Sequence, residues 1–289
     1  MRSEYLIEIL TPRQSDEDFY AALKRMGDRY QQAIDEGFSV SIPDNPMGVL
    51  RFQATEVINE LKLSVPPGRV LLHLNTFHTK EGLDAILRAA ADLGIKRVII
   101  ISGDGGERLP RLRPETIGSL SAVTTSIELT RYVHSAYPNT FLTGVAFNPY
   151  EPHEHEFEKL QRKVDAGAGF VITQPLLSSA PGIERVMQFG LPVTVGVWMS
   201  ENLKLLCDCV GYDLRETEKY DPICELGNIH KLYPNAGIYL SMIKLEKELA
   251  AVSRVLQGEK QSKALSRAEG MCMPSCGELL HAGFIKEPV

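Results

Sequence analysis

Residues 69–101 read RVLLHLNTFHTKEGLDAILRAAADLGIKRVIII, and they give the clearest indication of the fold class. Two short apolar runs, at 69–74 and 97–101, flank a segment at 81–93 whose apolar residues recur at helical spacing. A strand, a crossover helix and a second strand in this order place the two strands parallel in one sheet. Both runs are almost continuously apolar, as is typical of strands covered on both faces. The stretch therefore predicts a parallel sheet with helices packed outside it.

The same alternation continues along the rest of the chain. Helical spacing is found at 19–34, 81–93, 114–136 and 154–166. Strands are predicted at 4–10, 37–42, 69–74, 97–101, 141–146, 169–173, 192–197 and 236–240. Eight such units fit a (β/α)8 TIM barrel, with an open doubly wound sheet as the alternative. A GxGxxG motif does not follow the first strand, which argues against a Rossmann dinucleotide site, and there is no P-loop.

Composition limits the class of protein. The 289 residues carry a net charge of −6, which disfavours a nucleic-acid-binding protein. No apolar run is long enough to span a membrane, and the N-terminus is not a secretory signal peptide. We therefore expect a cytoplasmic protein that works without a membrane. Its domains are predicted as a single catalytic barrel at 1–258 and a short C-terminal tail at 259–289.

Five cysteines, an odd number, fit a reducing compartment better than a disulfide framework. Cys272, Cys276 and His281 lie close together in the tail and could hold a metal ion, with free thiols as the alternative. Three candidate ligands in a tail are weak support for a metal site. We expect no metal cofactor.

Active sites of (β/α)8 barrels lie where the strands end at their carboxyl side. The polar residues expected there include Glu8, His73, Asp104 and Gln174. Each has a structural explanation as well: a glutamate that faces solvent at the barrel end, a buried histidine, an aspartate in a glycine turn, and a glutamine that ends a strand. Glu8 stands out, because a carboxylate within the apolar run YLIEIL is costly to bury. Together these residues predict a polar ring at one mouth of the barrel.

One segment carries a resemblance. LQRKVDAGAGFVITQ, from Leu160 to Gln174, resembles the L-x-R-K-V-D-A-G-A-x-x-x-I-T-Q signature of the methylenetetrahydrofolate reductase family. EILTPR from Glu8, LGIKRVIIISGD up to Asp104, and TGVAFNPYEPHEHE from Thr143 are similar to further family segments, in the same order. The resemblance runs from about Tyr5 to Val197.

The resemblance implies an oxidoreductase that reduces 5,10-methylenetetrahydrofolate to 5-methyltetrahydrofolate with NADH or NADPH through bound FAD. The methylene bridge opens when its departing nitrogen is protonated, which requires a carboxylic acid that stays protonated near neutral pH. Glu8 matches the family's acid, Asp104 its aspartate beside the flavin and the folate, and Gln174 its substrate-binding glutamine. The positions that match flavin contacts are His73, Ser102, Gly103, Asp104, Phe147 and Lys163.

Several family contacts are replaced. An arginine expected near the flavin is Ser102, a tyrosine is Phe147, and a flavin-binding threonine corresponds to Ile42. Three explanations follow: FAD is held by other groups, for instance Arg108, Arg111 or Arg113; flavin is absent and hydride passes directly from NADH to the folate; or the chain uses a related one-carbon substrate.

A different class of function is a folate- or pterin-binding protein that serves a methyltransferase system without redox chemistry. An aldolase or decarboxylase lacks support, because no lysine ends a predicted strand where a Schiff base would form. The resemblance also implies a homo-oligomer.

Overall fold

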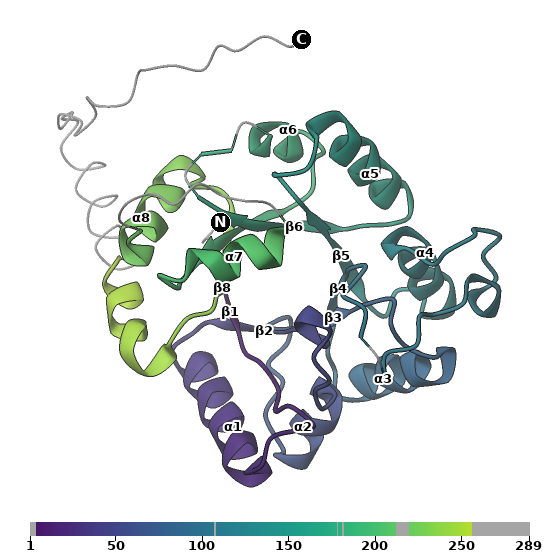
Figure 1. The fold of residues 1–289 in the computed structure, drawn as a ribbon, viewed down its shortest axis with the longest axis horizontal. Helices are drawn as coiled ribbons and strands as arrows, with labels where there is room; N and C mark the ends of the chain where they lie inside the picture. The colour runs from purple at the N-terminus through teal and green to yellow at the C-terminus, as the bar shows by residue number, and fades with distance from the viewer. Residues whose placement is uncertain (1–3, 107, 178, 181, 212–219, 256–289) are drawn as a thin grey trace.

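The computed structural model describes residues 4–106, 108–177, 179–180, 182–211 and 220–255. Eight parallel strands pair in sequence order, and β8 pairs with β1 to close a barrel (Figure 1). The predicted (β/α)8 TIM barrel is therefore confirmed, and an open sheet is excluded. The strands are β1 (Tyr5–Glu8), β2 (Ser39–Ile42), β3 (Val70–Leu74), β4 (Arg97–Ile100), β5 (Leu142–Phe147), β6 (Phe170–Leu176), β7 (Val193–Trp198) and β8 (Gly237–Ser241).

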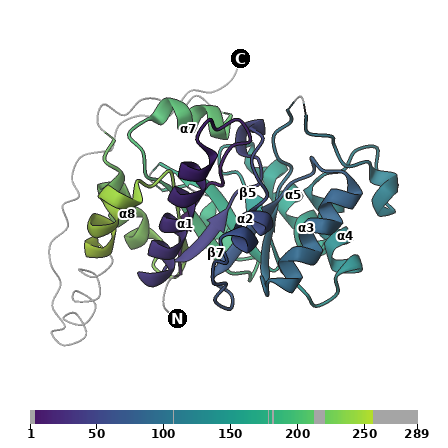
Figure 2. The same ribbon diagram turned by 90° about the horizontal axis from the view of Figure 1, so that it is seen from below.

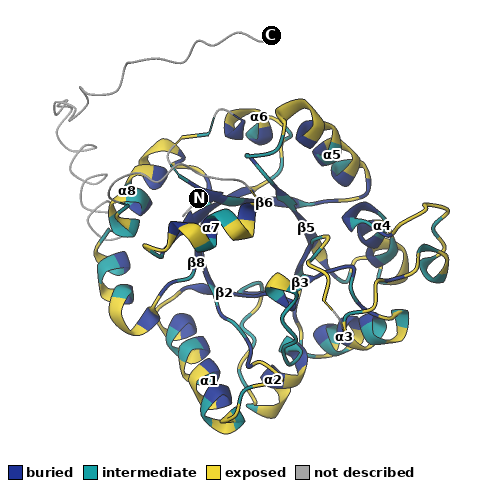
Figure 3. Ribbon diagram, viewed as in Figure 1, coloured by how far each residue is buried: buried dark blue, intermediate teal, exposed yellow. Residues whose placement is uncertain are grey.

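Helices surround the barrel and turn their buried faces toward it (Figure 3). They are α1 (Phe19–Asp35), α2 (Ala54–Glu60), α3 (Lys80–Asp92), α4 (Ser126–Ala136), α5 (His153–Asp165), α6 (Ile183–Met187), α7 (Leu203–Val210) and α8 (Pro222–Leu232), with short 3₁₀ turns at η1 (Pro46–Gly48) and η2 (Pro114–Ile117). Residues 245–255 are also helical. None of the described helices is both long and apolar enough to cross a lipid bilayer.

The predicted strands all exist, with ends that differ by a few residues. The single helix predicted at 114–136 is wrong. Gly118, with a φ of 71°, ends η2, and α4 begins only after Thr125. Thr125 and Glu128 form a reciprocal capping box, which fixes the start of α4 at this point. The tail at 259–289, with Cys272, Cys276 and His281, lies outside the described residues.

Alternation along the strands separates an inner from an outer core, because successive side chains point to opposite faces. Leu6, Leu71, Ile99, Phe170, Ile172 and Tyr239 form one buried cluster inside the barrel. Ile7, Leu72, Val98 and Val171, each one position away from a member of this cluster, belong to the larger core between barrel and helices. Residues two positions after the inner cluster therefore also point inward, at the level of the strand ends. Glu8 and His73 occupy such positions.

α7 differs from the other helices in its position. Figure 1 shows it inside the ring of helices, over the barrel, and the side view of Figure 2 shows it at one end. Leu205 and Cys209 of α7 line a cavity together with residues from the carboxyl ends of the strands. α7 thus covers the mouth at which the sequence predicts the active site.

Candidate active site

The carboxyl ends of the strands and α7 enclose a cavity of about 370 Å³. This volume lies within the range of about 300–1,000 Å³ that is usual for small-molecule sites. The lining is mainly apolar, with a few polar and charged groups. Glu8, His73, Gly103, Asp104 and Gln174, all singled out from the sequence, line it together. Tertiary structure thus brings these predicted residues to one place.

Glu8 ends β1 and lies half-buried in the floor of this cavity. Its Oε2 accepts a hydrogen bond of 2.8 Å from the hydroxyl of Tyr239 on β8. Burial raises the pKa of Glu8, while the hydrogen bonds from Tyr239 and the Met242 backbone and the nearby charge of Arg51 lower it. Since the effect of burial is larger, the pKa of Glu8 is raised overall, which is the direction that a general acid requires.

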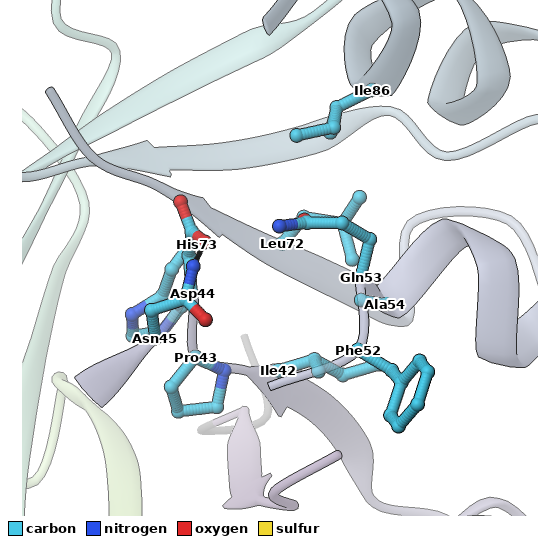
Figure 4. A pocket seen from close by; sticks show the side chains of 10 residues that line it. All are labelled: Ile42, Pro43, Asp44, Asn45, Phe52, Gln53, Ala54, Leu72, His73 and Ile86. Carbon is cyan, nitrogen blue, oxygen red and sulfur yellow. Dashed lines mark hydrogen bonds between the residues drawn. The ribbon is translucent and has the colours of Figure 1, made fainter. Parts of the chain in front are cut away.

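His73 lies on β3, in contact with β2. Its Nε2 is 2.9 Å from the hydroxyl oxygen of Ser41. Burial lowers the pKa of His73 to about 4, with a smaller opposing effect from Asp44, so the ring is neutral near pH 7. In Figure 4, His73 lies beside Asp44 and Asn45. These three side chains line a second hollow of about 10 Å³, enough for a single water molecule.

Asp44 holds the loop after β2 in place. Its carboxylate accepts hydrogen bonds from His78 Nε2 at 2.6 Å, the Asn75 backbone at 3.1 Å and the Asn45 side chain at 3.0 Å. Asp44 and His78 are both buried, so the pair is little screened by water. The loop that these contacts anchor carries Met47 and Arg51 into the cavity wall.

Asp104, in the loop after β4, and Gln174, on β6, both line the cavity and offer polar groups to a ligand. Asp104 is exposed, and its Oδ2 accepts a hydrogen bond of 2.8 Å from the backbone of Met47. Its Oδ1 makes no hydrogen bond with the described residues, nor does the side-chain amide of Gln174. A carboxylate oxygen and an amide can together bind the donor and acceptor edge of a heterocycle.

The sequence analysis did not identify two arginines that line the cavity as site residues. Arg13 and Arg51 lie opposite each other in an isolated antiparallel bridge, and both line the cavity. Arg51 donates to the Thr11 carbonyl, while its buried Nε has no hydrogen-bond partner among the described residues. Like charges placed opposite each other repel, so this pair favours an anionic ligand. The signal in the sequence was Arg13 at the end of EILTPR; nothing there marked Arg51.

The comparisons with known proteins identify the family of this chain. The family model for methylenetetrahydrofolate reductase matches residues 5–186. The chain belongs to this family. Methylenetetrahydrofolate reductase 1 of Schizosaccharomyces pombe is 28% identical over 109 residues, which cover 36% of this chain and only 17% of the fission yeast protein.

Solved structures share the fold at low sequence identity. An uncharacterised Clostridium thermocellum protein that binds two copies of 5-methyl-5,6,7,8-tetrahydrofolic acid superimposes with a TM-score of 0.58 and 12% identity, over 90% of this chain and 96% of its own. A Xanthomonas albilineans dihydropteroate synthase gives a TM-score of 0.53 at 13% identity, over 91% and 94%. This member of the methylenetetrahydrofolate reductase family thus shares its barrel with folate-related proteins.

The residues that match the family's flavin contacts do not all face the cavity. Phe147 is fully buried and packs on Phe157 of α5, because it points outward where its neighbour Ala146 points inward. Lys163 is buried; its ammonium donates to the Ala146 carbonyl at 2.6 Å and lies 3.7 Å from Glu156. Ser102 is exposed on the β4 loop and is not part of the lining.

The alternative cations for a diphosphate lie elsewhere too. Arg111 stacks over Phe77 and donates to the Thr124 carbonyl at 3.2 Å, and Arg113 is 3.8 Å from Glu115. None of Arg108, Arg111 and Arg113 is among the residues that line the cavity in the described part of the chain. The donor set predicted for the diphosphate of FAD does not fit this structure. Among the lining residues, the cations are Arg13 and Arg51.

Metal ligands are a separate question. In the ranges that the structure describes, no three His, Cys, Asp or Glu side chains are grouped so as to hold a metal ion.

Proposed function

We propose that this protein is a reductase that binds a tetrahydrofolate carrying a one-carbon unit in the cavity and reduces 5,10-methylenetetrahydrofolate to 5-methyltetrahydrofolate with NADH or NADPH. The observation that carries the proposal is Glu8, a carboxyl group whose pKa is raised by burial and which opens onto an otherwise mainly apolar cavity. The family match supports the same chemistry. The C. thermocellum barrel binds the methylated folate that this reaction would produce.

In this proposal Glu8 donates its proton to the bridge nitrogen that leaves the methylene carbon. The carbon–nitrogen bond breaks toward that nitrogen, and the electrophilic carbon accepts a hydride, which makes it a methyl group. One proton and one hydride are consumed, and the nicotinamide donor is oxidised. The surrounding apolar side chains exclude water, which would otherwise compete with hydride for the electrophilic carbon.

Four other residues orient the substrate in our proposal. Asp104 and Gln174 bind the pterin edge through the Oδ1 atom and the amide that have no other partner among the described residues. Arg13 and Arg51 bind an anionic part of the ligand, such as the glutamate carboxylates of folate, since charged hydrogen bonds from arginine to carboxylate are among the strongest.

FAD remains the cofactor that the family resemblance implies, but the misfit of its predicted diphosphate contacts favours a second candidate. In that candidate, the nicotinamide transfers hydride to the folate without flavin. The non-redox alternative, a folate-binding protein of a methyltransferase system, would use the same cavity without the acid chemistry of Glu8.

The visible absorbance spectrum of the purified protein separates these candidates when combined with an NADH oxidation assay. A flavin band that NADH bleaches and methylenetetrahydrofolate restores would support the FAD-dependent reductase. A colourless protein that oxidises NADH only when methylenetetrahydrofolate is added, with or without FAD in the buffer, would support direct transfer. Folate binding with only background oxidation of both NADH and NADPH, with and without added FAD, would refute the reductase proposal.

A further inference from the structure

Strand β6 does not pair regularly with β7 at the level of the cavity. The pairs on either side of the irregularity are Ile172 with Thr194 and Pro175 with Gly196. Two residues of β6, Thr173 and Gln174, therefore lie opposite a single residue of β7. Such an extra residue is a β-bulge, and bulges recur next to active sites, where they change the direction of a side chain.

The bulge changes the face of the sheet that the following residues occupy. Ile172 belongs to the cluster inside the barrel. In a regular strand Leu176 would also point inward, because side chains two positions apart share a face. Leu176 is instead buried in the core between barrel and helices. The change of face lies within residues 173–175, and Thr173, Gln174 and Pro175 all line the cavity.

The hydroxyl of Thr173 joins the two strands at the bulge. It accepts a hydrogen bond of 3.0 Å from the backbone N–H of Gly196 on β7, and it donates one of 2.8 Å to the carbonyl of Gln174. Both directions are fixed, since a backbone N–H can only donate and a carbonyl can only accept. Thr173 is 4% exposed, so its hydroxyl is shielded from competing water.

Neighbouring residues complete the bulge. Pro175 has no N–H to donate to the neighbouring strand, and its ring restricts Gln174 to extended backbone. The carbonyl of Pro175 accepts a hydrogen bond of 2.7 Å from the hydroxyl of Tyr150. A Cβ on Gly196 would lie 2.8 Å from the Thr173 carbonyl, so the missing side chain lets β7 approach the bulge closely. Side-chain hydroxyl groups thus hold two successive carbonyls of the bulge.

We propose that Thr173 is a positioning residue for Gln174: by bridging the Gly196 N–H and the Gln174 carbonyl, its hydroxyl fixes the backbone from which the Gln174 amide meets the ligand. This inference rests on the proposed binding of the folate by Gln174. The amide has no hydrogen-bond partner among the described residues, so its direction depends on the backbone that carries it. A group that is held in place before binding loses less conformational freedom when the ligand arrives.

Removal of the hydroxyl should therefore weaken folate binding. Thr173→Val keeps the shape of the side chain but leaves the Gly196 N–H and the Gln174 carbonyl without this partner. We expect the Kd for 5-methyltetrahydrofolate, measured by calorimetry, to rise about 3- to 10-fold, the range that corresponds to one hydrogen bond. Thr173→Ser retains the hydroxyl and should bind as the wild type does. In turnover assays KM should rise while kcat is unchanged, since Gln174 is assigned to binding.

A double-mutant cycle separates positioning from a general disturbance of the cavity. If Thr173 acts through Gln174, Thr173→Val should cause no further loss of affinity in a Gln174→Ala protein. A rise of Kd that is as large in this background as in the wild type would overturn the inference, and so would wild-type affinity in Thr173→Val. Thr173→Ala removes the same hydroxyl with a smaller side chain, and it replaces Thr173→Val in the cycle if that variant does not fold.

Thr130→Val is the matched control. Thr130 is a second buried threonine; its hydroxyl donates to the Ser126 carbonyl at 2.7 Å within α4, and it does not line the cavity. This variant should lose stability with no change in Kd. A wild-type protein that binds the folate without reducing it would refute the reductase, and the cycle would still test Thr173. A wild-type protein that does not bind the folate would refute both proposals.

Discussion

Replacing Glu8 with glutamine removes the acidic proton while keeping the size of the side chain. A positioned general acid contributes about 10²- to 10⁴-fold to a rate. We therefore expect kcat for methylenetetrahydrofolate reduction to fall by about this factor, equivalent to about 3–5 kcal/mol of transition-state stabilisation. KM should change little, because Asp104, Gln174 and the two arginines that we assign to substrate binding remain.

The same variant should change how stability depends on pH. Burial raises the pKa of Glu8 in the folded protein. The stability that comes from the protonated form is complete below the pKa of the unfolded chain, and it is lost as the pH rises through the higher folded pKa. Each unit between the two pKa values corresponds to about 1.4 kcal/mol. Glutamine does not ionise, so Glu8→Gln should gain in unfolding free energy relative to wild type as the pH rises from 4, below the usual glutamate pKa of 4.5, to 8.

NADH oxidation with saturating methylenetetrahydrofolate measures kcat, and urea unfolding at both pH values measures stability. Glu4→Gln is the control, because Glu4 lies just before β1 at the opposite end of the strand, where it pairs with Arg97 and accepts from Ser39 at 2.8 Å. It should keep its kcat and lose some stability at both pH values. A Glu8→Gln enzyme with wild-type kcat would refute the assignment of the acid. A stability difference that is the same at pH 4 and pH 8 would refute a raised pKa.

Three further predictions concern residues of the barrel and of the helices packed on it. Lys163→Met should lower the free energy of unfolding by about 1–3 kcal/mol, because the Ala146 carbonyl loses a buried hydrogen-bond donor. If urea unfolding is unchanged and cofactor binding is weakened, Lys163 is instead a ligand-binding group. Gly196→Ala should destabilise the folded protein by about 1–3 kcal/mol, since a Cβ there would lie 2.8 Å from the Thr173 carbonyl and 2.9 Å from Pro175 backbone atoms. Thermal unfolding tests this, and a wild-type Tm would contradict the close packing. Partial burial and the charges of Glu8 and Asp104 raise the pKa of Cys209 to about 11, so only about one thiol in a thousand is ionised at pH 8. Although Cys209 and Cys224 are both exposed, mass spectrometry should find Cys209 alkylated more slowly than Cys224; equal rates would contradict the raised pKa of Cys209.

Much of this protein can be predicted from local patterns. Apolar runs of strand length alternating with helical periodicity predict all eight strands, because a parallel strand covered on both faces has few polar positions. The same patterns place Glu8, His73, Asp104 and Gln174 at strand ends, and these residues do meet at one cavity. The break at Gly118 within the predicted helix 114–136 was missed, since apolar spacing alone does not report where a helix is capped.

Other features depend on which residues meet across the barrel. The side toward which Phe147 points, and the internal contacts of Lys163, follow from strand parity and helix packing, so matching motifs did not reveal that neither lines the cavity. Arg51 reaches the site through a loop whose course is set by the buried pair of Asp44 and His78. No local sequence pattern indicates these contacts between residues that lie far apart in the chain.

The division between the two levels has a simple physical reason. Residue type and period along the chain determine the strands, the helices and the polar residues that end the strands, since these depend on neighbours a few positions away. Closure of the barrel decides the rest: it places Tyr239 against Glu8, 231 positions earlier in the chain, and thereby decides what surrounds the acid. The sequence shows that a carboxyl group stands at position 8, but its pKa depends on burial, which raises it, and on hydrogen-bond partners, which lower it and which only the closed sheet brings together.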